Sequence, residues 1–190
     1  MRINRGISDQ VDRDNHRKML KPYFVIVTRW LLTPKIDTNE ILKKTAEARG
    51  ISEIVVASRG GKTALKIAEA MGKKVHVISI TEFSYSDDVK KKMKKLKMAP
   101  IENADLVIQD LREMNETLLM FGPGVKTALE VGAIAKQMEL VKGEFIAVAG
   151  GKKGIDTAMV LDTVHPEAEL VTEPVKQLAI KQIIASPLIT

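Results

Sequence analysis

Cysteine is absent from this chain of 190 residues. The chain therefore forms no disulfide bond, and it supplies neither a thiolate to a metal nor a thiol nucleophile to a reaction. A lack of cysteine fits a reducing compartment. The first twenty residues are polar and contain no apolar stretch of the length that a signal peptide needs. We therefore expect a cytoplasmic protein.

Long hydrophobic runs are also missing. The longest one, residues 23–32, is interrupted by Thr28 and Arg29 and has about half the length of a membrane-spanning helix. A soluble protein without a membrane partner is expected. At this length about 70% of the surface of the unfolded chain can be buried on folding, so a core can form without covalent cross-links.

Charge of one sign is in modest excess. Basic residues outnumber acidic ones by 30 to 24, a net charge of +6, which favours anionic partners without naming one. Six lysines lie close together: Lys90, Lys91, Lys92, Lys94, Lys95 and Lys97. They surround the apolar stripe of Val89, Met93 and Leu96, a pattern typical of a helix with a solvated basic face. That interpretation is favoured over nucleic-acid binding, because no aromatic residues alternate with the lysines to stack on bases.

The chain divides into two predicted parts. Residues 1–22 show no strand or helix period and are interpreted as a lead-in or contact arm. Residues 23–190 have the length of one domain. Short apolar, β-branched runs predict strands at residues 23–27, 53–57, 74–80, 105–109, 145–149, 157–161 and 179–185. Helical spacing predicts helices at residues 37–50, 86–98 and 125–140, and another that ends at Gly72.

This alternation determines the expected fold class. Strands that alternate with helices favour a mostly parallel sheet that is covered on both faces. We therefore predict a single α/β domain with a three-layer α/β/α sandwich of about five to six core strands. The close spacing of the last three strands predicts an antiparallel edge.

In open parallel sheets, ligands bind where strands lead into helices. The loop after the strand at residues 53–57 is Ser58, Arg59, Gly60, Gly61, Lys62 and Thr63. Its glycines let backbone N–H groups approach an anion, and the helix that follows has a positive N-terminal end. Arg59 and Lys62 add full charges. The alternative is a tight turn with a capping threonine, but the two charges favour anion binding.

Two further glycine-rich loops are candidates for the same site. Gly122, Gly124 and Lys126 lie at the start of the helix at residues 125–140, where a purely structural turn is the favoured interpretation of that loop by itself. Gly150, Gly151, Gly154, Asp156 and Thr157 lie between two strands, and this loop can equally be a simple reversal with Asp156 capping the turn.

Motifs for catalysis are missing from the sequence. Gly61-Lys62-Thr63 resembles the end of a nucleoside triphosphate loop, but the first glycine of that motif would fall on Val56, inside a strand. No serine elbow and no paired catalytic carboxylates can be named. The three histidines lack the spacing of metal ligands, so no metal is predicted.

Several segments carry a family likeness. Residues 53–66 and 75–81 look like the strand, loop, helix and strand of the pyruvate kinase C-terminal domain. Residues 121–126, Glu130, residues 143–151 and residues 154–158 resemble a stand-alone prokaryotic branch of that family, common in archaea. The Asp-Thr-Asn-Glu of residues 37–40 is similar to the family's Asn-Thr-Glu helix start with Asn and Thr exchanged. The likeness covers roughly residues 23–187.

The resemblance implies a fold like that of the pyruvate kinase C-terminal domain and a phosphorylated ligand. The family loop that matches Ser58–Thr63 holds a phosphate of a sugar-bisphosphate effector. Flavin mononucleotide (FMN) has been associated with the stand-alone branch, and a homodimer is suggested by the likeness alone. The catalytic barrel of pyruvate kinases is too large for this chain, so pyruvate kinase activity is not expected.

We therefore expect a protein that binds a small phosphorylated molecule, FMN or another nucleotide. One alternative is an enzyme that uses the same cleft. Another is a nucleic-acid or partner-docking module that acts through the helix at Lys90–Lys97. Bound flavin would favour the first two hypotheses, and strongly salt-dependent binding would favour the third.

Overall fold

The computed structural model of this chain describes residues 37–151, 154–165 and 177–186. The predicted arm at residues 1–22, its boundary with the rest of the chain and the predicted strand at residues 23–27 lie outside the described residues. From Thr38 on, the described residues lie in one compact unit.

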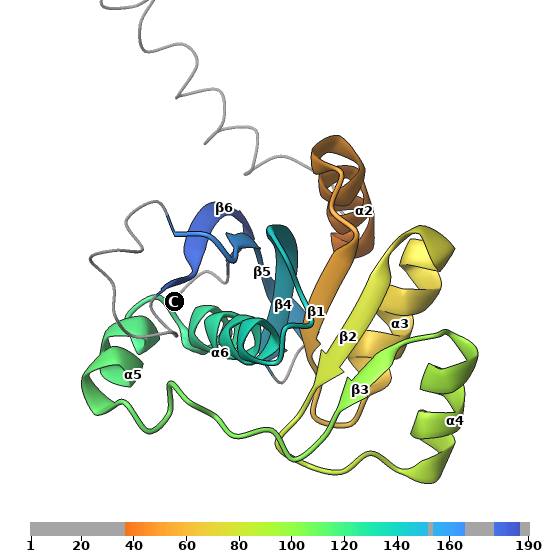
Figure 1. Cartoon of the computed structure of the whole chain (residues 1–190), viewed down its shortest axis with the longest axis horizontal. Helices are drawn as coiled ribbons and strands as arrows, with labels where there is room; N and C mark the ends of the chain where they lie inside the picture. The colour runs from red at the N-terminus through yellow and green to blue at the C-terminus, as the bar shows by residue number, and fades with distance from the viewer. Residues whose placement is uncertain (1–36, 152–153, 166–176, 187–190) are drawn as a thin grey trace, which may run out of the picture. The chain divides into compact units, whose positions relative to one another are not determined.

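Six strands form one sheet, and helices flank it (Figure 1). The helices are α2 (Thr38–Arg49), α3 (Lys62–Met71), α4 (Asp87–Lys95), α5 (Arg112–Leu119) and α6 (Pro123–Gln137), with a 3₁₀ turn at Gly72–Lys74. The strands are β1 (Glu53–Ala57), β2 (His76–Ile80), β3 (Ala99–Ile101), β4 (Glu144–Gly151), β5 (Gly154–Asp162) and β6 (Ala179–Ala185). Their order is β3-β2-β1-β4-β5-β6, parallel from β3 to β4 and antiparallel from β4 to β6.

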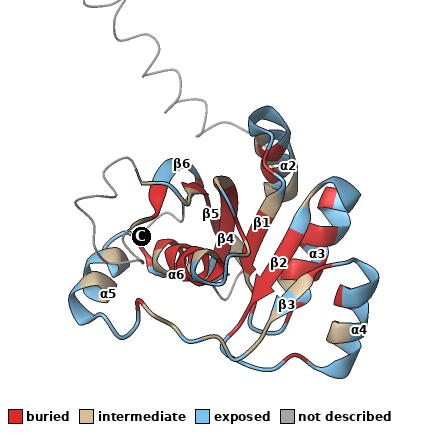
Figure 2. Ribbon diagram, viewed as in Figure 1, coloured by how far each residue is buried: buried red, intermediate tan, exposed pale blue. Residues whose placement is uncertain are grey.

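Alternation along β1 sends side chains to opposite faces of the sheet. Ile54 and Val56 lie in a core with buried residues of α2, α3 and α4. Val55 lies in a second core, which is built mainly with α6. Figure 2 shows the buried strands and helix faces between exposed outer surfaces. The described part of the chain thus has helices on both faces of a mostly parallel sheet, as predicted.

The sequence patterns locate most elements well. The predicted bounds of β1 and β6 match the structure, and the antiparallel edge is confirmed. The lysine-rich segment forms α4, with Met93 buried and Lys91, Lys92, Lys94, Lys95 and Lys97 exposed, which confirms the predicted solvated basic face. None of the helices in the described part of the chain combines the length and the hydropathy needed to span a bilayer.

The predicted strand at residues 105–109 is wrong. Residues 107–110 form a turn, and the buried Ile108 donates its N–H to the Glu130 carboxylate at 2.6 Å. The apolar residues of this run pack on the α6 side of the sheet instead of extending it. The edge position is taken by β3, where Pro100 is tolerated because an edge strand can lack one N–H donor.

Candidate functional site

The carboxyl ends of β1, β2 and β4 meet at one edge of the sheet, because these strands are parallel. The chain leaves β1 through α3 on one face, whereas β4 is preceded by α6 on the other face. Strand order therefore reverses at β1 and β4, and such a point leaves a crevice for ligands in α/β proteins. Two cavities lie at this edge of the sheet.

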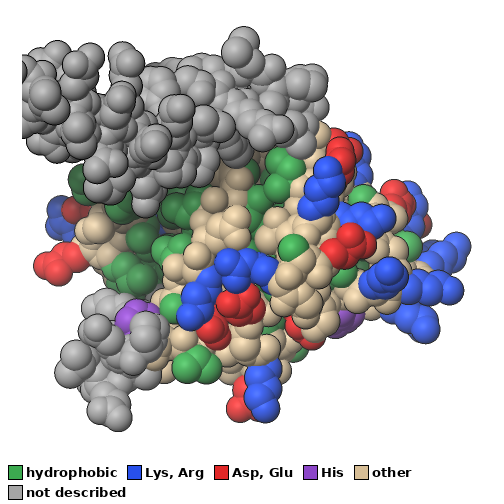
Figure 3. Space-filling model, turned by 90° about the horizontal axis from the view of Figure 1, so that it is seen from above, with side chains coloured by type: hydrophobic (Ala, Val, Ile, Leu, Met, Phe, Trp, Pro, Cys, Tyr) green, Lys and Arg blue, Asp and Glu red, His purple; other side chains and the backbone are tan. Residues whose placement is uncertain are grey.

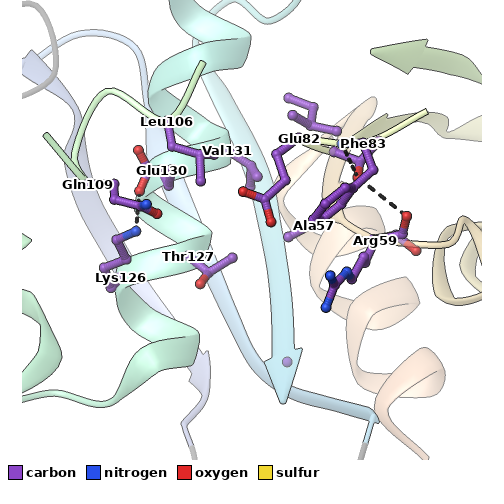
Figure 4. Close-up of a pocket in the computed structure, with 14 residues that line it drawn as sticks. Ala57, Arg59, Glu82, Phe83, Leu106, Gln109, Lys126, Thr127, Glu130 and Val131 are labelled. Atoms are coloured by element: carbon purple, nitrogen blue, oxygen red, sulfur yellow. Dashed lines mark hydrogen bonds and ion pairs between the residues drawn. The ribbon is translucent and has the colours of Figure 1, made fainter. Parts of the chain in front are cut away.

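The first, named the α6-side cavity, has a volume of about 300 Å³. Its polar lining includes Arg59, Glu82, Gln109, Lys126, Thr127 and Glu130. In Figure 4, Lys126 and Glu130 lie on one side of this cavity, and Arg59 and Phe83 lie on the other. The side chain of Glu82 projects from the Phe83 side toward the middle.

The second, named the α3-side cavity, has a volume of about 250 Å³. Its lining includes Arg59, Gly60, Lys62, Thr63, Gly150 and Gly154. Ala57, Ser58, Arg59 and Gly150 line both cavities, so the two spaces adjoin at the end of β1. One ligand can therefore extend from one cavity into the other across the end of β1.

The N-terminus of α3 opens at the α3-side cavity. Gly61 is the N-cap residue, with a φ of 76°, and no side chain caps the helix. The first helical bond runs from the Leu65 N–H to the Gly61 carbonyl. The N–H groups of Lys62, Thr63 and Ala64 thus remain outside the helical ladder, at the positive end of the helix dipole. The structure thus has the tight turn of the alternative prediction, in which the N–H of the N-cap glycine donates to the carbonyl three residues before it, but not the capping threonine.

Two cations accompany these N–H groups. The Arg59 guanidinium lies 4.3 Å from the centre of the Phe83 ring, a cation–π contact that orients it without neutralising it. Within the described ranges, neither Arg59 nor Lys62 forms an ion pair with a carboxylate. Their charges are therefore available to an anion.

Hydroxyl groups hold the loop that carries Arg59. The Tyr85 hydroxyl donates to the Ser58 carbonyl at 3.0 Å, and Ser79 lies 2.7 Å from the same hydroxyl. Thr81 donates to the Arg59 carbonyl at 3.4 Å. Burial raises the pKa of Tyr85, so its phenol keeps its proton at neutral pH. Both loop carbonyls are thereby engaged by the protein itself.

A buried ion pair forms the opposite wall of the α6-side cavity. The Glu130 carboxylate accepts the Ile108 N–H through Oε1, and its Oε2 lies 2.6 Å from Lys126 Nζ. Only 2% of the Glu130 side chain and 12% of the Lys126 side chain are exposed. The two residues are four positions apart on α6, so they share one helix face.

Gly124 allows α6 to approach β5 closely. A Cβ at this position would lie 2.0 Å from Thr157 Oγ1 and 2.7 Å from Asp156 Oδ1. The second and third predicted loops are thus brought together, but by direct packing. Gly122, Gly124, Asp156 and Thr157 are not among the described residues that line either cavity, so their predicted contact with a ligand is not supported.

The predicted site residues thus separate into two groups. Those that line at least one cavity are Ser58, Arg59, Gly60, Lys62, Thr63, Lys126, Gly150 and Gly154. Gly61 instead packs against α4, where a Cβ would lie 2.5 Å from a Val89 methyl carbon. Gly151 pairs with Gly154 where the β4–β5 hairpin reverses.

Sequence reasoning missed several lining residues: Thr81, Glu82, Phe83, Gln109, Thr127 and Glu130. Residues 81–83 directly follow β2, so the rule that sites lie at strand ends could have found them. Gln109 was missed because it fell within the wrongly predicted strand.

The comparison with protein families adds no identification, since no family model matches the sequence. The likeness to the pyruvate kinase C-terminal domain therefore stays a prediction from residue patterns. Among the described residues, no group of three or more His, Asp or Glu side chains is arranged to hold a metal ion.

Proposed function

We propose that this protein binds a small molecule through a phosphate group held in the α3-side cavity. The observation that carries the proposal is the charge of that cavity. Its described lining includes Arg59 and Lys62, adjoins the uncapped start of α3 and contains no carboxylate. Backbone N–H groups at a helix start, backed by full positive charges, are the usual donors to phosphate oxygens.

The expected affinity follows from the number of charged hydrogen bonds. Each contributes about 1.5–3 kcal/mol. Three or four of them suffice for micromolar binding once the cost of association is subtracted. Arg59, Lys62 and the N–H groups at the start of α3 supply that number of donors.

FMN or another nucleotide is the candidate ligand that the family likeness supports. The α6-side cavity adjoins the phosphate position and would take the organic part of such a molecule. Its volume of about 300 Å³ is at the lower end of the range for small-molecule sites. The polar side chains that line the α6-side cavity would orient the organic part of the ligand.

Native mass spectrometry of freshly purified protein tests whether a phosphorylated molecule is retained. Flavin absorption in the same sample, together with the mass of the retained molecule, identifies FMN. Isothermal titration with FMN and with inorganic phosphate then compares the wild type with the Arg59→Ala/Lys62→Ala double variant. We expect the double variant to lose about a hundredfold or more in affinity, since two charged hydrogen bonds are removed.

Lys66→Ala is the matched control, because Lys66 is exposed on α3 and lines neither cavity. It removes one positive charge from the same helix and should change the affinity by less than about twofold. Equal affinities of the wild type and the double variant would contradict the phosphate assignment.

A second candidate function uses the basic face of α4. Figure 3 shows Lys and Arg side chains at the right of the face that is seen from above. In α4 and just beyond it, five lysines are exposed, and they form its basic face. Such a face would bind a polyanion such as RNA. Binding should then weaken steeply with salt and be lost when Lys91, Lys92, Lys94 and Lys95 become glutamine.

A further inference from the structure

The two adjoining cavities differ in the balance of charge in their walls. The described lining of the α3-side cavity contains Arg59 and Lys62 and no acidic residue. The lining of the α6-side cavity contains two cations, Arg59 and Lys126, and two carboxylates, Glu82 and Glu130. Formal charges therefore sum to +2 in the first wall and to zero in the second.

Lys126 is not available as a simple anion receptor. Its Nζ lies 2.6 Å from Glu130 Oε2, inside a wall where Glu130 is almost fully buried. The other carboxylate oxygen of Glu130 is occupied by the Ile108 N–H. A ligand anion would have to draw Lys126 away from a buried partner and leave that partner uncompensated, which is unfavourable. An uncharged acceptor can instead use the remaining ammonium hydrogens.

Glu82, on the opposite side of the α6-side cavity from Lys126, also disfavours a bound anion. Its side chain is exposed and projects toward the middle of the cavity (Figure 4). A carboxylate accepts hydrogen bonds from hydroxyl groups and repels other carboxylates and phosphates. Gln109 and Thr127, in the same lining, can each donate and accept. This set of groups matches a hydroxyl-rich, uncharged molecule.

We infer that the α6-side cavity recognises the neutral, hydroxyl-bearing part of a ligand whose phosphate lies in the α3-side cavity. The ligand class is then a phosphate monoester of a sugar-like polyol, with one anionic end. Residues Ala57, Ser58, Arg59 and Gly150 line both spaces, which lets one molecule extend across the end of β1. This inference rests on the proposed phosphate site.

Four probes test the inference by isothermal titration: inorganic phosphate, ribose 5-phosphate, ribulose bisphosphate and phosphoglycolate. Ribose 5-phosphate should bind about tenfold more tightly than inorganic phosphate, because its hydroxyls gain hydrogen bonds in the α6-side cavity. The second phosphate of ribulose bisphosphate and the carboxylate of phosphoglycolate should bring no gain over ribose 5-phosphate.

The Glu82→Gln variant removes one carboxylate while keeping the size of the side chain. Because Glu82 is exposed, the variant should fold normally. We expect the affinity for ribulose bisphosphate, relative to inorganic phosphate, to rise several-fold, since a repelling charge is gone. Glu69→Gln is the matched control, as Glu69 is exposed on α3 and lines neither cavity. It should leave the ratio unchanged.

The outcomes separate the two proposals. If inorganic phosphate binds through Arg59 and Lys62 but ribose 5-phosphate binds no more tightly, the inference about the α6-side cavity is overturned and the phosphate site stands. Tightest binding of ribulose bisphosphate to the wild type, or an unchanged ratio in Glu82→Gln, overturns the inference as well. If none of the probes binds, or if Arg59→Ala/Lys62→Ala binds phosphate normally, both proposals are wrong.

Discussion

The Tyr85 hydroxyl donates a hydrogen bond of 3.0 Å to the main-chain carbonyl of Ser58, the first residue after β1. Its own oxygen accepts a hydrogen bond from Ser79 at 2.7 Å, since the phenol proton is already used on Ser58. One buried side chain therefore links the end of β1, the strand β2 and the segment that leads into α4. It holds the start of the proposed phosphate loop in place.

Tyr85→Phe should loosen this loop. The substitution keeps the ring but removes one of the two donors to the Ser58 carbonyl, which retains only the Gly61 N–H at 3.3 Å. It also leaves the buried Ser79 hydroxyl without its partner, which costs about 1–3 kcal/mol in the free energy of unfolding. Affinity for inorganic phosphate should fall with it, because the loop is less well positioned. Urea denaturation and phosphate titration measure the two effects.

Ser79→Ala is the control for that experiment, because it removes a hydrogen bond to the same phenol without touching the loop carbonyl. It should reduce stability but leave phosphate affinity near that of the wild type. If Ser79→Ala and Tyr85→Phe lower phosphate affinity equally, the specific role of the Ser58 contact is refuted.

The pH dependence of stability should reveal the titration of the Tyr85 phenol. Burial, with a smaller contribution from the charge of Glu102, raises the pKa of Tyr85 above the usual 10.0. The folded state therefore favours the protonated phenol, and its stabilising effect is fully present below about pH 10. It is lost as the pH rises through the raised pKa, since the unfolded chain then loses its proton more readily.

Urea midpoints measured from neutral pH into the alkaline range should fall more steeply for the wild type than for Tyr85→Phe. Parallel pH profiles of the two proteins would show that the Tyr85 phenol does not titrate with unfolding. A difference between the two profiles is due to the Tyr85 phenol, because the other tyrosine and the lysines are common to both proteins.

Local patterns predicted much of the fold. Ile54, Val55 and Val56 of β1 form a short apolar, β-branched run, and a glycine-rich loop follows within a few residues. The segment at residues 105–109 has an equally apolar pattern, yet it packs on α6 because Glu130 binds the N–H of Ile108. No local pattern contains that long-range contact. The three-residue β3 was missed because it is short and contains Pro100.

The site was predictable to the extent that its parts are local. One short segment combines the strand end, glycines, charges and the helix start, so the place of Ser58, Arg59, Gly60 and Lys62 at the cavities could be anticipated. The role of Gly124 could not, because it depends on how closely α6 approaches Thr157. Glu130 is also a tertiary feature, since a glutamate on a helix is usually exposed.

Gly124→Ala tests the packing of α6 on β5. A methyl group would lie 2.0 Å from Thr157 Oγ1, so either the helix or the strand must shift. Overpacking of this kind costs about 1–3 kcal/mol. Gly60→Ala is the matched control, because nothing lies within 4 Å of the position of its Cβ. Thermal unfolding should separate the two variants, and similar melting temperatures would contradict the close approach.

The ion pair of Glu102 and Lys90 should make stability depend on acidic pH. Lys90 Nζ lies 3.0 Å from Glu102 Oε2, and the Tyr85 N–H donates to the other oxygen. The hydrogen bond from Lys90 is the main cause that lowers the pKa of Glu102 below 4.5. This stabilising effect is present above the unfolded pKa and lost as the pH falls through the lowered one.

Lys90→Gln should therefore reduce the loss of stability between neutral pH and about pH 3, since the Glu102 pKa moves back toward its usual value. Lys91→Gln is the control, because its partner Asp88 is highly exposed and 4.0 Å away. Denaturation profiles of equal slope for wild type and Lys90→Gln would show that the pair does not act in this way.

The buried pair of Lys126 and Glu130 should show strong coupling between its two members. Glu130→Ala leaves the Lys126 ammonium, only 12% exposed, without its partner, and it also leaves the Ile108 N–H without an acceptor. Breaking a buried pair in this way costs about 3–5 kcal/mol.

Lys126→Met/Glu130→Leu replaces both charges with apolar side chains of similar size, and it should cost less than Glu130→Ala because no uncompensated charge remains. Urea denaturation of the two single variants, Lys126→Met and Glu130→Leu, and of the double variant gives the coupling energy. Additive effects of the two substitutions would mean that the charges do not depend on each other, and the neutral wall assigned to the α6-side cavity would lose its basis.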